Sequence, residues 1–465
     1  MKTFMFARHA IAKSFLFSSF RADYLCALEY FLRKFAADDP AAHESFKVYV
    51  DKLLSNGING KPYSYFGDAK ALDIIRSFLG AKSDFLTFYY RFFCAALLID
   101  CLSLLAFSDL DLDLDKARAI LSDFYSLSPK RYHQFFKSLF DYLYAEDHSK
   151  PVTFKGIWIA KNQIECWNAE KIFEQKPLKK ILFTASMSAG KSMLINAIAG
   201  KKITRTKSTA ATGRIHYIYN KPFEDGLTAK LEDNGSLTMD ASEKELMDEN
   251  NNDSVQVWTY FRSFLSNKFR WCLIDTPGVN FSRNPEHAEI THKAIEKEPW
   301  DYLIYIVNGE YIGTIDDRQH IEYIADHAPG NKVIFLLNKL DNYSLKDDSI
   351  PDAVSDLHDE LEEIGFKHPV ICPISAYTAM LAKKYLFKSD FNPDEKYDFD
   401  LLRRKFMKAD YDLSVYSKFL TDEDRAQRFD MPKNFLKKEN PIIKDCYNLL
   451  INSGLSGFEK ILSEG

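Results

Sequence analysis

The sequence of 465 residues lacks a cysteine pattern that could form a disulfide framework or a zinc site. No two cysteines have CxxC spacing, and their number is odd, so free thiols in a reducing compartment are the simplest interpretation. The seven cysteines are Cys26, Cys94, Cys101, Cys166, Cys272, Cys372 and Cys446. We therefore expect a cytoplasmic protein, and peripheral association with a membrane stays open.

The sequence also lacks an apolar run long enough to cross a membrane. The longest run, Phe92 to Phe107, is interrupted by Asp100 and falls short of the roughly 20 residues that span a bilayer. It predicts a buried helix. Before Asp23 the chain contains no acidic residue, which is typical of a transit peptide or an amphipathic surface helix. The alternative for this segment is the first helix of a bundle.

A strong excess of positive charge is absent too, because the formal net charge is -5. Such a chain has no overall basic field for non-specific nucleic-acid binding, and none is expected. The densest basic run, 403–405 together with Lys408, is interpreted as a solvated helix face. Hydrophobic residues make up 46% of the chain, which excludes global disorder.

Two patterns divide the chain. Residues 1–150 show apolar side chains at helical spacing and predict an all-α domain, followed by a linker helix over 151–176. From Pro177 onward, short apolar runs alternate with helical stretches, which predicts an α/β domain with a mostly parallel sheet over 177–465. Within it, residues 380–450 are expected to form a helical insertion before a closing helix. The predicted strands are 181–183, 271–274, 303–307, 333–337 and 370–374.

A phosphate-binding loop follows the first of these strands. The segment ASMSAGKS matches GxxxxGK[ST] except at its first position, and it lies between a strand and a helix. Successive backbone N–H groups and the helix N-terminus enclose phosphate oxygens, while Lys191 reaches the outer phosphates and Ser192 can bind Mg²⁺. The residues expected to line this loop are Ala185, Ser186, Met187, Ser188, Ala189, Gly190, Lys191 and Ser192.

Three further motifs follow predicted strands in the order of guanine-nucleotide enzymes. Asp275 begins DTPG and can hold Mg²⁺ through water, and the Gly278 N–H can sense the terminal phosphate. NKLD begins at Asn338; the Asp341 carboxylate can accept two hydrogen bonds from guanine, a donor pair that adenine lacks. The remaining nucleotide contacts are expected from Lys339, Ser375 and Ala376. Parallel strands bring such motifs to one sheet edge, so we expect GTP and GDP as ligands.

A threonine in the loop after the first helix should complete the Mg²⁺ site and close over the nucleotide. Four candidates lie there: Thr204, Thr206, Thr209 and Thr212. Thr209 is the preferred catalytic and metal-binding candidate, with Thr212 second.

With these motifs the sequence resembles the dynamin superfamily, most closely its bacterial members. The resemblance covers about residues 177–465 and is carried by SAGKS, STAAT, DTPGVN, NKLD and PISA. The long span from Ala185 to Asp275 and a hairpin expected over 228–240 fit this resemblance, as does the closing segment SGLSGFEKIL. Dynamins carry a long helical stalk after the GTPase domain, so residues 1–150 could serve as a short substitute, or the sequence could be a fragment.

The resemblance implies a GTPase that dimerises across its nucleotide and is stimulated by assembly. Ser188 matches a serine that helps hold a monovalent cation in dynamins, and Lys191 is the other phosphate-loop catalytic candidate. Met187 stands where eukaryotic dynamins have a glutamine, and Val279 where Ras-like enzymes have one, so no side chain at either position can orient water as glutamine does.

Three functions stay open at this point. The first is a dynamin-like GTPase whose nucleotide-dependent homodimer moves a helical domain, at a membrane or elsewhere. The second is a regulatory GTPase switch that recruits a protein partner without remodelling a membrane. The third is an RNA-binding assembly factor of the Era type, which would need a basic RNA-binding module.

Overall fold

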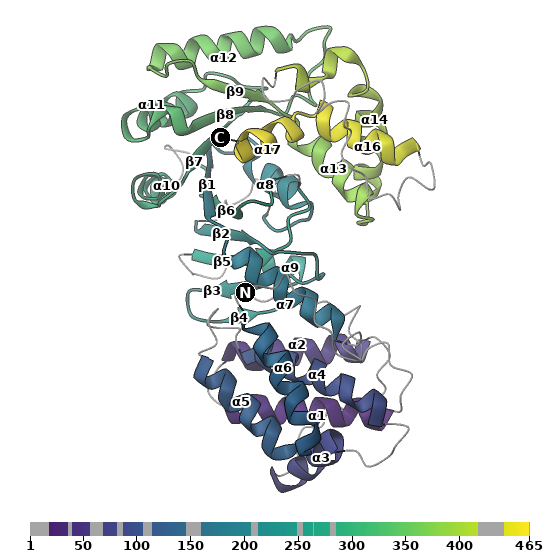
Figure 1. Ribbon diagram of the computed structural model, residues 1–465. Coiled ribbons are helices and arrows are strands. Elements are labelled where there is room, and N and C mark those ends of the chain that lie inside the picture. The colour runs from purple at the N-terminus through teal and green to yellow at the C-terminus, as the bar shows by residue number, and fades with distance from the viewer. Residues whose placement is uncertain are drawn as a thin grey trace. The chain divides into compact units, whose positions relative to one another are not determined.

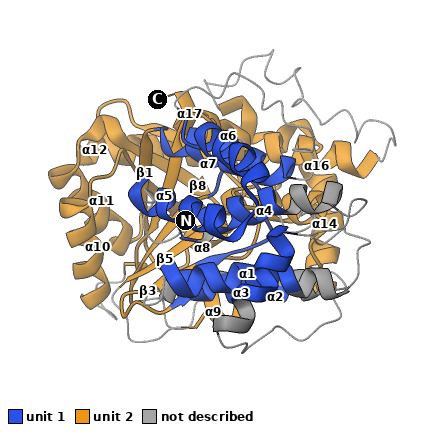
Figure 2. Cartoon of the chain, turned by 60° about the horizontal axis from the view of Figure 1, so that its bottom comes forward, with its two compact units in different colours: residues 1–176, 221–229, 237–240 blue, residues 177–220, 230–236, 241–465 orange. Residues whose placement is uncertain are grey.

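The structure is a computed structural model that describes residues 18–35, 40–55, 68–80, 87–105, 114–145, 160–205, 213–248, 254–263, 265–279, 285–416 and 441–464. Two compact units divide the chain (Figure 2). The first comprises residues 1–176 together with 221–229 and 237–240, and the second comprises the rest. The boundary at Lys176 meets the predicted end of the linker helix, whereas the two short segments of the first unit come from within the predicted α/β region.

The first unit is mainly helical (Figure 1). Its helices are α1 (Ser18–Phe35), α2 (Pro40–Ser55), α3 (Asp68–Gly80), α4 (Thr87–Leu105), α5 (Leu114–Leu127), α6 (His133–Leu143) and α7 (Lys161–Glu174), with a short η2 (Lys130–Tyr132) before α6. Rings from three helices form its centre: Phe31 stacks on Phe124 with centroids 4.5 Å apart, and Phe124 meets Phe136 edge-on at 5.4 Å. Such pairs combine large buried area with a defined geometry.

Helix α4 carries the apolar run of the sequence, and it is buried as expected. Residues 94–102 are inaccessible or nearly so, including Asp100, which is 3% exposed and accepts a hydrogen bond from the Tyr24 hydroxyl. A buried carboxyl needs such a partner because its desolvation is otherwise uncompensated. Within the described ranges, none of the helices has both the length and the apolar character that a membrane span requires.

The sheet has nine strands in the order β4-β3-β5-β2-β6-β1-β7-β8-β9, and all of them except β4 and the first residue of β3 belong to the second unit. Their bounds are β1 (Leu178–Ala185), β2 (Ile215–Asn220), β3 (Ala229–Glu232), β4 (Leu237–Thr238), β5 (Ser254–Thr259), β6 (Arg270–Asp275), β7 (Tyr302–Asn308), β8 (Val333–Asn338) and β9 (Val370–Pro373). The pairs β6–β1, β1–β7, β7–β8, β8–β9 and β2–β5 are parallel, whereas β2 and β6 are antiparallel. The predicted α/β class is therefore confirmed, and all five predicted strands are present.

Helices cover both faces of this sheet. They are α8 (Lys191–Ala199), α9 (Glu243–Leu246), α10 (Pro285–Lys297), α11 (Ile315–His327), α12 (Ile350–Ile364), α13 (Ala376–Leu386), α14 (Pro393–Lys405), α16 (Pro441–Asn452) and α17 (Leu455–Glu464), with short turns η4 (Gly330–Lys332), η5 (Ala409–Tyr411) and η6 (Leu413–Tyr416). Figure 1 shows α10, α11 and α12 on one side and α8, α13 and α17 on the other. The predicted hairpin is β3 with β4, and the predicted closing helix is α17.

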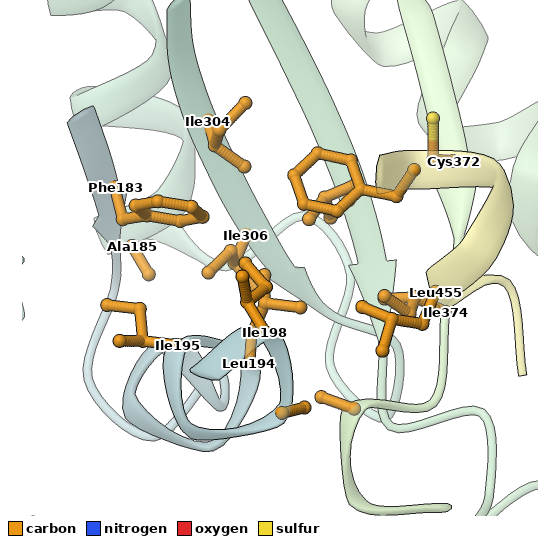
Figure 3. Close-up of a cluster of buried hydrophobic side chains, with 14 of the residues drawn as sticks. Phe183, Ala185, Leu194, Ile195, Ile198, Ile304, Ile306, Cys372, Ile374 and Leu455 are labelled. Carbon is orange, nitrogen blue, oxygen red and sulfur yellow. The ribbon is translucent and has the colours of Figure 1, made fainter. Parts of the chain in front are cut away.

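The core between α8 and the sheet explains the uninterrupted apolar strands. Ile195 and Ile198 of α8 face Phe183 and Ile306 of the central strands, and all four are completely buried (Figure 3). Burying one such side chain contributes about 1.5–3 kcal/mol. Because α8 follows the phosphate-loop segment directly, this packing holds the loop against the sheet edge.

Candidate nucleotide site

The loop between β1 and α8 has the backbone of a phosphate-binding turn. Ala185 is the last residue of β1, paired with Ile306, so its extended backbone needs no glycine. Ser188 and Gly190 have positive φ angles of 65° and 97°, which turn the chain into α8. A Cβ at Gly190 would lie 2.2 Å from Nδ2 of Asn338, so this position requires glycine for space as well as for conformation.

The side chain of Lys191 forms an ion pair with Asp275 at the adjoining end of β6. Both are buried, with exposed fractions of 8% and 2%. The carboxylate therefore already holds a cationic group at the sheet edge. Ser192, in the first turn of α8, adds a hydroxyl oxygen from the next residue. Carboxylate and hydroxyl oxygens are the ligands Mg²⁺ prefers, so the donor set here fits that ion.

DTPG is held directly against the phosphate loop. The Met187 N–H donates to the Val279 carbonyl at 3.1 Å, and the Val279 N–H donates to the Ala185 carbonyl at 3.0 Å. The Thr276 hydroxyl donates to the Phe183 carbonyl at 2.9 Å. These bonds place Gly278 beside Met187, since a Cβ on Gly278 would lie 3.5 Å from Met187 Cγ. Two loops predicted from separate motifs thus form one surface.

Asn338 joins the phosphate loop to the two guanine motifs. Its Nδ2 donates to the Ala189 carbonyl at 2.9 Å, and its Oδ1 accepts from the Ala376 N–H at 3.1 Å. Asn338 is 3% exposed, so an unpaired amide there would be costly. One buried side chain therefore fixes the distance between the loop expected to bind phosphate and the loops expected to bind the base.

Asp341 and Ser375 meet across these two loops. The Ser375 hydroxyl donates to Asp341 Oδ1 at 2.7 Å, and Ser375 also caps α13 by accepting from the Thr378 N–H. Burial raises the pKa of Asp341, while the hydrogen bond from Ser375 and the nearby Lys405 ammonium lower it. The carboxylate is thus held in a partly desolvated environment, where a hydrogen bond from a ligand N–H group is stronger than in water.

Lys339 adopts a left-handed backbone with φ of 68°. This conformation is uncommon in residues other than glycine and turns the chain sharply between Asn338 and Asp341. Its ammonium lies 3.0 Å from Glu310, which follows β7. The stem of Lys339 is therefore held along the site rather than away from it.

Of the four candidate threonines in the loop after α8, Thr204 alone lies within the described residues. Thr204 is 4% exposed, and its N–H and hydroxyl both bond to Asn196 Oδ1, so it is tied to α8. Thr206, Thr209 and Thr212 lie outside the described residues. The assignment of Thr209 stays a prediction.

The basic run of α14 does not form a free cationic face. Arg403 pairs with Asp445 of α16 at 2.8 Å, and Lys405 donates to the carbonyls of Asp341 and Tyr343, at 2.6 Å each. Two of the four basic side chains of the run, counting Lys408, therefore bind within the domain, and Arg404 and Lys408 are exposed. The interpretation of the run as a solvated helix face is therefore wrong for Arg403 and Lys405.

Several residues around the site were not anticipated from the sequence. Glu310, Tyr343, Lys405 and Ser453 all support the guanine loops, the last by accepting from the Ser375 N–H at 2.9 Å. Ser453 begins the closing segment SGLSGFEKIL, and the other three belong to no motif with a characteristic spacing. Lys405 stood out only as a member of a basic run, which suggested a different role.

The chain is similar to one protein family and, more distantly, to several solved structures. Residues 181–340 match the family model described as the Dynamin family. No curated protein matches the sequence.

Three solved structures are distant likenesses. A bacterial dynamin pair described as sensing and tethering membranes shares 17% identity, covering 89% of this chain and 71% of that one, with a TM-score of 0.35. Era from Aquifex aeolicus, bound to GDP and AlF4−, shares 18% identity over 46% of this chain, with a TM-score of 0.27. Toc33 from Arabidopsis thaliana with Mg²⁺ and GMPPNP shares 12% identity over 45% of this chain, with a TM-score of 0.29.

The matches cover different shares of the other chains, 58% for the Era structure and 77% for Toc33. All three identities and TM-scores are low, so the assignment rests on the family match and on the motifs within it. Those motifs extend from the phosphate loop to the first three residues of NKLD, and the structure brings them to one sheet edge. Residues 181–340 are therefore similar to the Dynamin family.

Proposed function

We propose that this chain is a dynamin-like GTPase that binds GTP with Mg²⁺ at the edge of β1, β6 and β8, and that binding drives two copies of the chain to associate. The observation that carries the proposal is the double hydrogen bond of Asn338, which joins the phosphate loop and the guanine loops into one site. Hydrolysis and release of phosphate would then reverse the association and move the helical region of residues 1–150.

The proposed roles follow from position. Residues 185–190 enclose the phosphates with N–H groups other than that of Met187, which already donates to the Val279 carbonyl. Lys191 exchanges its partner Asp275 for the outer phosphate oxygens. Gly278 donates its N–H to the terminal phosphate. At the other end of the site, Asp341 accepts from the guanine N1–H and amino group. The backbone at Ala376, where α13 begins, contacts O6. The stem of Lys339 covers the base. Ser375 holds Asp341 in the orientation this requires.

Mg²⁺ would be held by Ser192, by Asp275 and by Thr209. When bound, Mg²⁺ neutralises the charge on the phosphate oxygens. The fit rests on the oxygen donors at the ends of β6 and β1 and on the cationic partner that Asp275 already has. Ser188, at the exposed tip of the loop, is the proposed partner of a monovalent cation.

The first test is the mass of the protein in solution, measured by size-exclusion chromatography with light scattering. The samples contain no nucleotide, GDP, GTP, or GDP with fluoroaluminate as a transition-state mimic. We expect a dimer with the mimic and a monomer with GDP. A constant mass in all four samples, with nucleotide binding confirmed by calorimetry, would rule out nucleotide-driven association.

The membrane part of the proposal needs its own experiment. Vesicles of neutral and of anionic lipid are sedimented with the protein in each nucleotide state. Co-sedimentation that depends on GTP supports action at a membrane. Failure to bind either vesicle in any state, with dimerisation intact, favours the alternative of a regulatory switch that recruits a protein partner.

A further inference from the structure

Lys405, the last residue of α14, reaches the loop that carries Asp341. Its Nζ donates to the Asp341 carbonyl and to the Tyr343 carbonyl, with both distances 2.6 Å. An ammonium shared by two carbonyls that are two residues apart holds the intervening backbone in one curvature. Charge-assisted bonds of this length are among the stronger hydrogen bonds in proteins.

Two tyrosines, Tyr411 and Tyr343, make further hydrogen bonds that hold this loop. The Tyr411 hydroxyl donates to the Tyr343 carbonyl at 3.2 Å and accepts from the Leu345 N–H at 3.3 Å. The Lys405 ammonium lies 4.6 Å from the centre of the Tyr411 ring. The Tyr343 hydroxyl donates to the Gly309 carbonyl at 2.7 Å. We call Lys405, Tyr411 and Tyr343 the loop clamp.

The helix that supplies Lys405 is itself fixed to the guanine-loop helix α13. Lys384 of α13 pairs with Glu395 at 2.6 Å, and Tyr377 donates to Asp398 at 2.7 Å. Tyr385 stacks on Phe399 with ring centroids 5.2 Å apart. Ser375 caps α13, and Ala376 is its first residue. Helix α13 therefore supports both the clamp and the loop that carries Ser375.

From this geometry we infer that Lys405 and Tyr411 are positioning residues for guanine recognition, and that the segment after α13 sets the specificity of the nucleotide site through the clamp. The inference rests on the proposed role of Asp341. It adds that the direction of the Asp341 carboxylate is set by residues more than sixty positions downstream, which hold its backbone and touch no nucleotide themselves.

The charges around Asp341 support this assignment. Burial raises its pKa, and the nearby Glu310 raises it further, whereas Ser375 and the Lys405 ammonium lower it. Tyr377 of α13 is also within electrostatic reach of the carboxyl. Removing the Lys405 charge should therefore raise the pKa of Asp341. Guanine binding, which needs the ionised carboxylate, should then be lost at a higher pH than in the wild type.

The experiment measures the affinities of GDP and IDP by calorimetry, because inosine lacks the amino group that Asp341 is proposed to bind. In Lys405→Met we expect the GDP affinity to fall about tenfold and the IDP affinity to fall less, so the ratio of the two affinities narrows. Lys408→Met is the matched control: it removes a neighbouring exposed lysine and should leave the ratio unchanged. The acid limb of GDP binding should move to higher pH only in Lys405→Met.

A folded Lys405→Met protein with the wild-type ratio would overturn the inference. If this variant does not fold, Tyr411→Phe decides the question, because it removes one hydroxyl; we expect the ratio to narrow about threefold, and an unchanged ratio counts against the clamp. Failure of the proposed site is recognised separately. Wild-type protein that binds GDP and IDP equally would remove the role of Asp341 and the inference with it.

Discussion

The Asn338 side-chain amide lies 2.9 Å from the Ala189 carbonyl, so the end of β8 is bonded to the turn that follows β1. This contact leaves no room for a side chain on Gly190, where an added Cβ would lie 2.2 Å from the same amide nitrogen. The phosphate loop and the guanine loop are therefore built around one shared bond. Disturbing either side should affect both.

Gly190→Ala should destabilise the domain and abolish nucleotide binding. The substitution forces a β-carbon into a left-handed conformation, at a cost of about 1–2 kcal/mol, and drives it into Asn338. Gly235→Ala is the control, because Gly235 has a similar φ of 83° but nothing within 4 Å of its added Cβ. Thermal unfolding and GDP calorimetry compare the two. Equal effects on GDP binding would contradict the role of the Asn338 contact.

Lys191→Met should lose GTP hydrolysis and also destabilise the nucleotide-free protein. It removes the partner of the buried Asp275 carboxylate, and breaking a buried ion pair typically costs about 3–5 kcal/mol. The double variant with Asp275→Asn should recover part of the unfolding free energy but none of the hydrolysis. Chemical denaturation and phosphate release give the two readouts. A double variant no more stable than the single one would show that the pair is not energetically coupled.

Asp341→Asn should change the preferred base from guanine to xanthine. An amide can donate to the C2 carbonyl of xanthine, whereas it cannot accept both guanine donors. We expect the GDP affinity to fall on the order of 100-fold and the XDP affinity to rise. Asp347→Asn, at an exposed position in the same loop, serves as the control. Unchanged discrimination between GDP and XDP would place the base elsewhere.

Stability should fall in mild acid because of His320. Burial, with a smaller contribution from His292, lowers the pKa of His320 from 6.5 to about 3, and its ring lies 2.7 Å from the Thr184 hydroxyl. Below pH 6.5 the His320 side chain becomes protonated in the unfolded state but stays neutral in the folded state. The stabilisation is thus complete above that pH and decreases as the pH falls toward 3.

Between about pH 7.5 and pH 5.5, this group should account for about 1.4 kcal/mol of the lost unfolding free energy. His320→Gln should remove that part of the pH dependence, which denaturant titrations at the two pH values would measure. His358→Gln, which replaces a histidine whose side chain is 40% exposed, is the comparison variant. An identical slope in both variants would mean that His320 is not the group responsible.

The sequence alone determined the order and place of the nucleotide motifs. Each apolar run ended in a characteristic turn, and parallel strands must bring those turns to one edge, so the fold and the proposed nucleotide class followed from local spacing. Ala185 illustrates this, because an extended residue at the end of β1 tolerates the missing glycine. The family resemblance is confirmed by the match over residues 181–340.

The tertiary structure alone decided which side chains hold the motifs in register. Lys405 reaches the guanine loops from the end of α14, and Glu310 pairs with Lys339 from the end of another strand. The backbone carbonyl of Ser453, in the turn between α16 and α17, accepts from the Ser375 N–H. No periodicity encodes such partners, because a lysine at the end of a helix looks the same whether it faces water or two carbonyls. Only the packing of α14 on α13 selects between these outcomes, and it does so through contacts that depend on the whole domain being folded.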